Sequence, residues 1–365
     1  MTTANLESKN HSVYLGTLNR NPDAGIYIST FNSETQQLSS PELAVALPTG
    51  AIFLISNQDE SLLFAASATP KDTTPSDGVI YSFRINKDHS LTLINSSPTQ
   101  GVTPCHMRLT RSGNFLLTAN YTGGSISVLP VSPNGELGAA VQVVQHSGSS
   151  VDEKRQATPH PHSINLSPDE RFAFAADLGT DVLTVYEFDA AAGKLTARPD
   201  LDFKLQPGAG PRHFSFHPNE KFAYVINELD STVNVFDYDA TTGKLTESQV
   251  VVTLPEGYTD KNFPAEVTVH PNGKFLYGNN RGHDTFACFT IDQENGKLSH
   301  LAHVHTGGVF ARHFVLTPEG NAIIAANQES ATVTVLKIAE NGIPELTQTL
   351  PLDSPASIYF VKQAK

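Results

Sequence analysis

The stretch that decides the fold is residues 210–228, which read GPRHFSFHPNEKFAYVINE. Its segments 213–216 and 222–226 are rich in aromatic and β-branched residues, and the Pro-Asn-Glu-Lys segment between them is typical of a tight turn. We therefore expect two short antiparallel strands joined as a hairpin. The start of the first strand and the end of the second then lie at the same end of the hairpin. The polar side chains expected together at that end are Arg212, His213, Asn227 and Glu228.

The same unit recurs along the chain. When the second strands are aligned, the steps between equivalent positions are 53, 57, 50, 53 and 48 residues. The aligned positions are Leu62, Phe115, Phe172, Phe222, Phe275 and Ile323. Periods of this length, made of strands without helices, are typical of the blades of a propeller. The sequence therefore predicts an all-β fold, a β-propeller.

The two ends of the chain each supply part of one more blade. Segments 13–18, 25–31 and 38–47 have strand composition but no inner strand before them, whereas residues 355–361 match the inner strand of the repeat and lack the other three. We expect the N-terminal strands and the C-terminal strand to share one blade, which closes the ring and removes its free edges. This blade brings the predicted number to seven. Residues 1–10 are predicted to be an N-terminal tail, and residues 11–365 a single seven-bladed propeller domain.

The composition indicates a soluble protein of a reducing compartment. The 365 residues include two cysteines, Cys105 and Cys288, which give no disulfide framework. The N-terminal residues do not resemble a signal peptide, and no stretch reaches membrane-spanning length. The formal net charge of −13 argues against nucleic-acid binding, so any anionic ligand requires a local cluster of arginines. We expect a cytoplasmic monomer or homodimer that binds neither nucleic acid nor membranes.

The hairpin topology divides the connections between two faces of the ring. Turns 167–170, 217–220 and 270–273 lie on one face, which we call the turn face. The opposite face, which we call the pocket face, collects many polar groups around the central opening, and converging polar groups are the default hypothesis for a binding site. The polar, aperiodic run 145–158 is predicted to be a loop over the rim. The pocket-face residues are His106, His160, His162, Asp177, Arg212, His213, Asn227, Glu228, Glu266, Asn280, Arg281, Arg312 and His313.

Five motifs at these positions resemble those of one known family. They are His160-Pro161-His162-Ser163, Gly210-Pro211-Arg212-His213, Asn227-Glu228-Leu229, Asn280-Arg281-Gly282-His283-Asp284 and Arg312-His313-Phe314. In this order they are similar to the motifs of the lactonase family of seven-bladed propellers, which includes bacterial cycloisomerase-2-type 6-phosphogluconolactonases and fungal carboxy-cis,cis-muconate cyclase. The resemblance spans nearly the whole chain. It departs from the family pattern in the first full blade, where Thr49-Gly50-Ala51 replaces the usual Asn-Pro-Ser and Ser67 replaces a usual acidic residue.

The resemblance implies an enzyme that acts on lactones. The residues that match the functional set of the cyclase are His162 (or His160, since the motif carries two histidines), Arg212, Glu228 and Arg281. We expect hydrolysis of 6-phospho-D-glucono-1,5-lactone to 6-phosphogluconate, a step of the pentose phosphate pathway, without a metal or another cofactor. The residues expected to bind this sugar-phosphate lactone are His106, His160, His213, Asn227, Glu266, Arg312 and His313.

Hydrolysis of a lactone requires a base that activates water, donors for the oxyanion and a group that binds the phosphate. His162 suits the first role, because an imidazole is partly neutral near pH 7 and can accept a proton. Arg212 or Arg281 can stabilise the oxyanion or bind the phosphate through a planar fork of N–H donors. Glu228 can hold an arginine, orient a histidine or act as an acid or base, and the sequence leaves these roles open.

Other interpretations compete with this one. Within the family, the nearest alternative is a cyclase that closes or opens a muconolactone. From another class comes a non-catalytic propeller that binds a protein, although a cluster of arginine, histidine and glutamate favours an enzyme. A zinc site is disfavoured because the arginines would repel a cation. The histidines of the His160-Pro161-His162 motif could instead close hydrogen bonds in a loop, Cys105 is expected to be a buried thiol, and His217 and His270 are expected to be structural.

Overall fold

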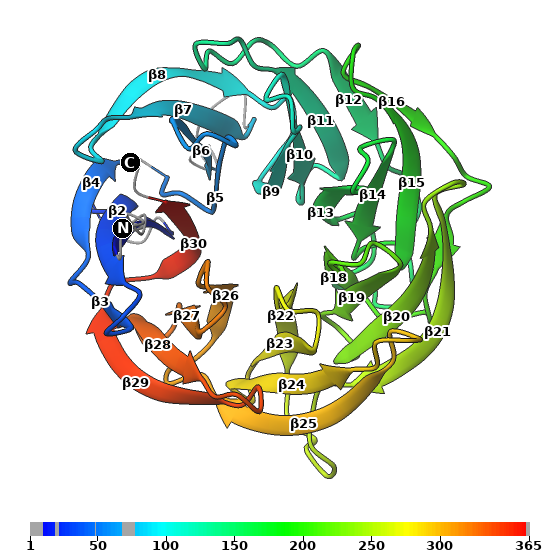
Figure 1. Ribbon diagram of the computed structural model, residues 1–365. Helices are drawn as coiled ribbons and strands as arrows, with labels where there is room; N and C mark the ends of the chain where they lie inside the picture. Colours follow the sequence, from blue (N-terminus) through cyan, green and yellow to red (C-terminus); the bar gives the residue numbers. More distant parts are fainter. Residues whose placement is uncertain (1–9, 19–21, 48, 68–76, 363–365) are drawn as a thin grey trace, which may run out of the picture.

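The chain folds into a ring of seven β-sheets. The computed structural model describes residues 10–18, 22–47, 49–67 and 77–362. Within these ranges it contains thirty strands and no helix. These ranges therefore contain no helix that could span a membrane. The sheets follow one another around a central axis, and the colours in Figure 1 run around the ring from blue to red. The predicted all-β, seven-bladed propeller is confirmed.

Six blades are each built from one continuous segment, with the strands in chain order from the centre outward (Figure 1). The first comprises β5 (Phe53–Ser56), β6 (Leu62–Ser67), β7 (Val79–Ile85) and β8 (Leu91–Pro98). The second comprises β9 (Pro104–Leu109), β10 (Phe115–Asn120), β11 (Ser125–Pro130) and β12 (Gln142–Gln145). The third comprises β13 (Pro161–Leu166), β14 (Phe172–Asp177) and β15 (Val182–Asp189), with β16 (Lys194–Ala197) and β17 (Phe203–Lys204) both pairing with β15.

The remaining continuous blades have four strands each. One comprises β18 (Pro211–Phe216), β19 (Phe222–Asn227), β20 (Thr232–Asp239) and β21 (Lys244–Val252). The next comprises β22 (Phe263–Val269), β23 (Phe275–Arg281), β24 (Thr285–Ile291) and β25 (Leu298–His305). The last comprises β26 (Ala311–Leu316), β27 (Ala322–Asn327), β28 (Thr332–Ile338) and β29 (Pro344–Pro351).

The seventh blade is shared by the two ends of the chain, as expected. Its innermost strand is the C-terminal β30 (Pro355–Lys362), which pairs with β1 (Asn10–Thr17), and β1 pairs with β2 (Gly25–Asn32). The expected third strand over 38–47 is split into β3 (Gln37–Leu38) and β4 (Glu42–Ala46), both on β2. Most of the predicted N-terminal tail lies outside the described residues. Because the shared blade is paired from both termini, the ring has no open edge at its seam.

The middle strands hold the blades together. Every residue of β14 is buried, because both faces of its sheet pack against neighbouring blades. Phe174 of this strand stacks on Phe214 of the next blade, with ring centroids 5.4 Å apart and an interplanar angle of 13°. The buried residues around this pair form one of seven hydrophobic clusters described in the ring.

The repeated Gly-Lys turns have a packing role. Gly243 has φ +79°, which favours glycine, and a Cβ at this position would lie 2.6 Å from the ring of Phe172 in the preceding blade. Gly296 approaches Phe222 in the same way, with a Cβ distance of 2.5 Å. Four of the aligned aromatic residues, Phe115, Phe172, Phe222 and Phe275, are covered in this way by a glycine turn of the following blade. This contact explains why both features recur with the blade period.

Candidate active site

A β-bulge recurs at the pocket-face end of the innermost strand. In six of the seven blades, the pairing of this strand with its neighbour slips near that end. In the hairpin of residues 210–228, Pro211 pairs with Asn227 and His213 with Ile226, so Arg212 is the extra residue. A bulge changes the direction of the side chain that it leaves unpaired, and bulges are frequent next to active sites. The bulges therefore determine which side chains surround the axis.

The unpaired residues include four of the eleven predicted site residues. The full set is Cys105, His162, Arg212, Arg312 and Ala356, with Ala265 and Glu266 sharing the bulge of β22. The seventh innermost strand, β5, pairs with β6 without a shift. This is the blade that departs from the family pattern, and it carries a buried hydrogen bond between the hydroxyls of Thr49 and Ser67. The departure thus coincides with the loss of the bulge.

Glu228 lies at the centre of the charged cluster. It directly follows β19, and its carboxylate accepts hydrogen bonds from arginines of three segments. Arg212 Nε and Arg281 Nη2 lie 3.0 and 2.6 Å from Oε2. Arg155 Nη2 lies 2.5 Å from Oε1. Glu228 and Arg212 are only 5% and 2% exposed. Three members of the predicted catalytic set are therefore in direct contact.

Backbone acceptors fix two of these arginines further. Arg212 Nη1 donates to the carbonyl of Ala265 at 2.6 Å, and Arg281 Nε donates to the carbonyl of Phe263 at 2.8 Å. The ring of Phe310 lies 5.0 Å from the guanidinium carbon of Arg281. Each of the two guanidinium groups keeps one terminal nitrogen that makes no hydrogen bond within the described part of the chain. These nitrogens are donors held in place before a ligand arrives.

The cluster is positively charged although the protein as a whole is acidic. Burial alone would raise the pKa of Glu228, but Arg281, Arg212 and Arg155 together lower it to about 2. Burial lowers the pKa of Arg281 to about 10, against the opposing effect of Glu228. Both groups are therefore charged at pH 7, and one carboxylate cannot neutralise all the arginines around it. The sequence analysis predicted that an anionic ligand of this acidic protein, with its net charge of −13, would require a local cluster of arginines. The arginines around Glu228 form such a cluster.

Arg312 differs from the other arginines of the cluster. It occupies the bulge of β26 and is partly exposed. Within the described residues it forms neither a hydrogen bond nor an ion pair, and its pKa is lowered by burial and by the charge of Arg281. A guanidinium without a counter-ion, close to other cations, is available to an anionic group of a ligand.

His162 occupies the bulge of β13 and is 6% exposed. Its Nδ1 lies 3.8 Å from Cys105 Sγ, and its ring centroid lies 5.2 Å from the rings of Tyr121 and His213. Burial, followed by the charge of Arg212, holds the pKa of His162 well below its usual value. The imidazole is therefore neutral at pH 7 and can accept a proton. Burial raises the pKa of the Cys105 thiol to about 12, so the thiol is a poor nucleophile.

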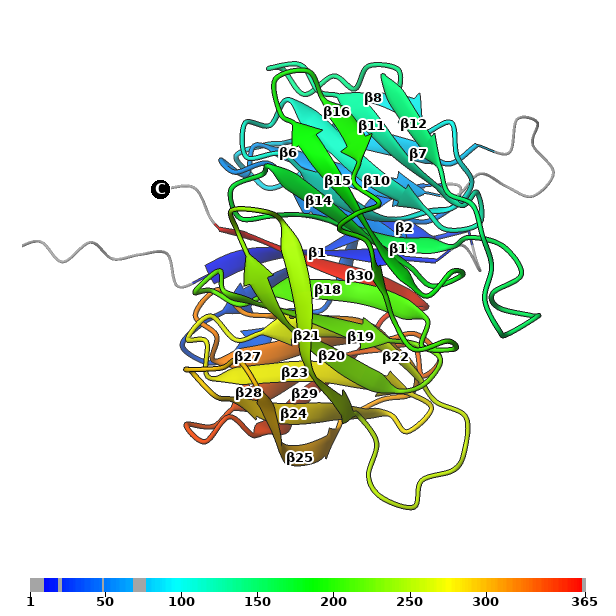
Figure 2. The same cartoon turned by 90° about the vertical axis from the view of Figure 1, so that its right-hand side faces the viewer.

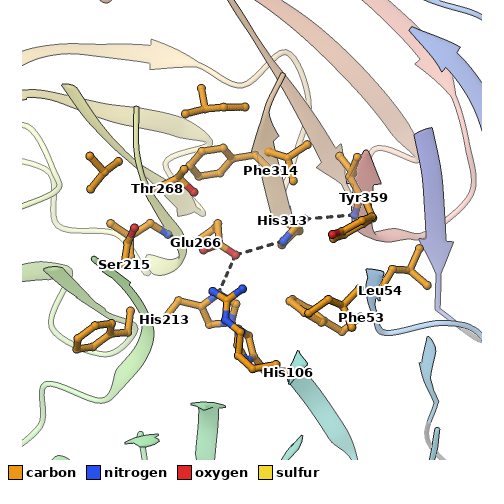
Figure 3. Close-up of a pocket in the computed structure, with 18 of the residues that line it drawn as sticks. Phe53, Leu54, His106, His213, Ser215, Glu266, Thr268, His313, Phe314 and Tyr359 are labelled. Atoms are coloured by element: carbon orange, nitrogen blue, oxygen red, sulfur yellow. Dashed lines mark hydrogen bonds and ion pairs between the residues drawn. The ribbon is translucent and has the colours of Figure 1, made fainter. Parts of the chain in front are cut away.

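A layer of three histidines around Glu266 lies one residue further along the innermost strands (Figure 3). His213 Nδ1 and His313 Nε2 lie 2.7 and 3.3 Å from Glu266 Oε2. Backbone amides donate to Nδ1 of His106 and of His313, at 3.3 Å in each case. Burial lowers the pKa values of the three histidines and raises that of Glu266. Neutral His213 therefore donates from Nδ1, and its buried Nε2 has no hydrogen-bond partner among the described residues. We call these four residues the histidine layer.

Comparison with known proteins places this geometry in a family. The model of the family described as "Lactonase, 7-bladed beta-propeller" matches residues 12–360. The chain belongs to this family. The resemblance drawn from the five sequence motifs is thereby confirmed.

Several relatives cover almost the whole chain. A 6-phosphogluconolactonase from Bacillus subtilis (strain 168) is 34% identical over 355 residues, 96% of this chain and 98% of that protein. A 6-phosphogluconolactonase from Formosa agariphila is 29% identical over 350 residues, 93% of this chain and 96% of that protein. Among solved structures, a periplasmic gluconolactonase from Pseudomonas aeruginosa has a TM-score of 0.90 at 29% identity, covering 96% of this chain and 99% of that one.

Asn227, predicted to bind substrate, has partners inside its own blade. It is fully buried, and its amide donates to Thr232 Oγ1 and Asn234 Oδ1 at 2.7 and 2.6 Å. Asn120 and Asn327 make equivalent hydrogen bonds to the third strands of their own blades. The position of Asn227 therefore favours a structural link between strands over the predicted role in binding.

The two histidines of the His160-Pro161-His162 motif have different surroundings in this lactonase-family chain. His160 stacks on Tyr121 with ring centroids 4.6 Å apart, and its Nδ1 lies 2.9 Å from the backbone carbonyl oxygen of Tyr121. Its backbone amide donates to Asp177, whose other carboxylate oxygen lies 2.7 Å from His146 Nδ1. These contacts hold the segment that enters β13. His162, at the bulge and under the influence of the arginines, is the better placed of the two for catalysis.

Arg155 is a site residue that the sequence analysis missed. It belongs to the segment between β12 and β13, which was predicted as a loop over the rim and which projects from one side of the ring in Figure 2. Besides Glu228, its Nη2 reaches the hydroxyl of Tyr121 at 3.3 Å. The segment has neither a repeat nor a motif, so its length and its position between two blades were the only signals. The loop adds a third cation to Glu228.

Among the described residues, no group of three or more His, Cys, Asp or Glu side chains is arranged to hold a metal ion. The oxygen atoms of Glu266 are instead occupied by His213, His313 and the backbone amide of Val267. His217 and His270, on the turn face, donate to or accept from backbone groups: their Nε2 atoms lie 2.9 and 2.7 Å from the carbonyls of Gly273 and Gly320 in the next blade. These two histidines link adjacent blades.

Proposed function

We propose that this protein hydrolyses 6-phosphogluconolactone to 6-phosphogluconate. The observation that carries the proposal is that neutral His162 and Arg312, which has no partner among the described residues, both occupy pocket-face bulges of innermost strands, in a ring that also holds the arginines fixed by Glu228. The 6-phosphogluconolactonases among the relatives support the same activity. The two cysteines, which are buried and form no disulfide, support the proposed cytoplasmic location. We propose a monomer or homodimer that acts on a small-molecule lactone.

The groups of the cluster can perform each step of the reaction. His162 takes a proton from water while the water oxygen forms a bond to the carbonyl carbon of the lactone. The remaining terminal nitrogens of Arg212 and Arg281 donate to the oxyanion that develops. The bond between this carbon and the ring oxygen then breaks, and the imidazolium of His162 gives its proton to that oxygen. The ring opens to a carboxylic acid and a hydroxyl group, and His162 returns to its neutral form.

Arg312→Met separates phosphate binding from the chemistry. We expect kcat/KM for 6-phosphogluconolactone to fall about ten- to a hundredfold, because charge-assisted hydrogen bonds contribute about 1.5–3 kcal/mol each. On unphosphorylated gluconolactone, kcat/KM should change little. Steady-state kinetics on both lactones, corrected for spontaneous hydrolysis, measures this difference.

Arg84→Met is the matched control for this experiment. Arg84 is exposed on β7, a third strand of its blade, and its replacement should leave both reactions unchanged. An equal loss on both lactones in Arg312→Met would assign Arg312 to the oxyanion instead. Equal kcat/KM values for the two lactones in the unmodified protein would remove the case for a sugar phosphate. An unphosphorylated lactone, as in the name of the Pseudomonas neighbour, would then be the better candidate.

The pH profile tests whether the buried imidazole is the base. A base must be deprotonated to act, and burial and Arg212 hold the pKa of His162 well below 6.5. We therefore expect kcat/KM for gluconolactone to stay constant as the pH falls through 6.5 and to decline only at lower pH. Gluconolactone is the suitable substrate because it has no phosphate whose own ionisation would add to the profile. An acidic limb centred at or above pH 6.5 would indicate that another group is the base.

A further inference from the structure

The centre of the ring holds a cavity on the turn-face side of the histidine layer. This cavity of about 420 Å³ is lined by residues of the innermost strands of six blades, and it reaches Pro271 and Pro318 on the turn face. The arginines that surround Glu228 do not line it, nor does Arg312. Figure 3 shows Glu266, His213, His313 and His106 on its wall. We call this cavity the turn-side chamber, and its size falls in the range of about 300–1,000 Å³ that is usual for small-molecule sites.

Arg108 is a charged group of this chamber that forms no ion pair with the described residues. Arg108 lies on β9, an innermost strand that is enclosed by the ring, but the residue is exposed. Because Arg108 lines the cavity, its exposed surface faces the turn-side chamber. Its Nε and Nη2 donate to Asn165 Oδ1 at 3.3 and 3.2 Å. Asn165 is uncharged, and no carboxylate of the described residues forms an ion pair with Arg108. The guanidinium is therefore held in one orientation without an ion pair to any described residue, although the charge of Glu266 in the same chamber acts on it.

The rest of the lining limits what Arg108 can receive. The walls are mainly apolar, and their partly exposed aromatic residues are Phe53 and Tyr359. Glu266 also lines the chamber, and its carboxylate is already bound by neighbouring imidazoles. One cation near a carboxylate favours a ligand with a single negative charge over a doubly charged phosphate ester. Apolar walls favour a ligand whose body is apolar.

We propose that the turn-side chamber is a binding site for a small monocarboxylate with an apolar body. The carboxylate accepts hydrogen bonds from Arg108, and the body lies against the aromatic rings of Phe53 and Tyr359. Because none of the arginines around Glu228 takes part, this site is separate from the one proposed for lactone hydrolysis and does not depend on that function.

Benzoate is the probe, and its uncharged analogue benzamide is the matched ligand. Titration calorimetry at constant ionic strength should show saturable binding of one benzoate per chain, with benzamide at least about tenfold weaker, because it lacks the charge that Arg108 recognises. Arg108→Met should weaken benzoate binding by a similar factor. Arg84→Met, on the outside of the ring, and Arg312→Met, in the lactone site, should bind benzoate like the unmodified protein.

Three results would overturn the proposal. They are the absence of saturable benzoate binding up to its solubility limit, equal affinities for benzoate and benzamide, and loss of binding in Arg312→Met but not in Arg108→Met. The last result would place the anion in the lactone site. If Arg108→Met does not fold, the unmodified protein still decides the question. Crystals soaked in 4-bromobenzoate should show the anomalous peak of bromine inside the chamber, and a peak beside Arg312, or no peak, contradicts the assignment.

Discussion

Replacement of His162 by Gln should lower kcat by about 10²- to 10⁴-fold, the usual contribution of a general base. The imidazole is neutral and sits at the bulge of β13, where it can accept a proton from water. The melting temperature should change little, because the polar contact recorded for its side chain, to Cys105 Sγ, is a weak one at 3.8 Å. Steady-state kinetics and thermal unfolding of the same preparation measure both effects.

His270→Ala is the control for this experiment, because His270 also belongs to the repeated hairpin but lies on the turn face instead of the pocket face. Its Nε2 is 2.7 Å from the carbonyl of Gly320, and its Nδ1 accepts from the amide of Asn272 at 3.1 Å. Loss of these buried hydrogen bonds should lower the free energy of unfolding by about 1–3 kcal/mol. The kcat of the folded variant should be unchanged. A similar loss of kcat in both variants would refute the assignment of the two histidines to different faces.

The fold was predictable because its signal is repeated. Phe115, Phe172, Phe222 and Phe275 are each covered by a glycine turn of the following blade, so one physical requirement appears several times in the sequence. The shared blade was predictable from what each terminus lacked. The split of the third strand into β3 and β4 was missed, although the break at residues 39–41 falls on Ser-Ser-Pro, a composition that favours a turn.

The candidate site was predictable only in part. The hairpin placed Arg212 near Glu228, and the structure confirms this contact. The same argument also selected Asn227, because position along a strand indicates which end of the blade a residue occupies but not where its side chain is bonded. Arg155 was missed since an aperiodic loop carries no register to align. Arg108 was missed because its exposure depends on the shape of the turn-side chamber, and no local sequence pattern describes that shape.

Glu228→Gln should lower the free energy of unfolding at pH 7 by about 3–5 kcal/mol, the usual cost of removing one partner from a buried ion pair. The variant leaves the guanidinium groups of Arg155, Arg212 and Arg281 close together without a counter-ion. Burial already lowers the pKa of Arg281, and Glu228 is the carboxylate that opposes this effect. The charge of Glu228, in contrast, is stabilised by three arginines at once. The loss of their fixed positions should also lower kcat/KM on both lactones. Denaturant unfolding and steady-state kinetics measure the two effects.

The stability difference between the unmodified protein and Glu228→Gln should depend on pH if it is electrostatic in origin. The pKa of Glu228 is about 2 in the folded protein, below its ordinary value of 4.5, so its contribution is complete above about pH 4.5 and is lost as the pH falls towards 2. The stability gap between the unmodified protein and Glu228→Gln should therefore narrow over this interval. Glu228→Asp, which keeps the charge, should recover part of the stability, and Asp200→Asn, which breaks an exposed pair with Arg198, should leave the unfolding midpoint unchanged. A gap that stays constant from pH 7 to pH 2 would mean that packing, not the three ion pairs, accounts for the role of Glu228.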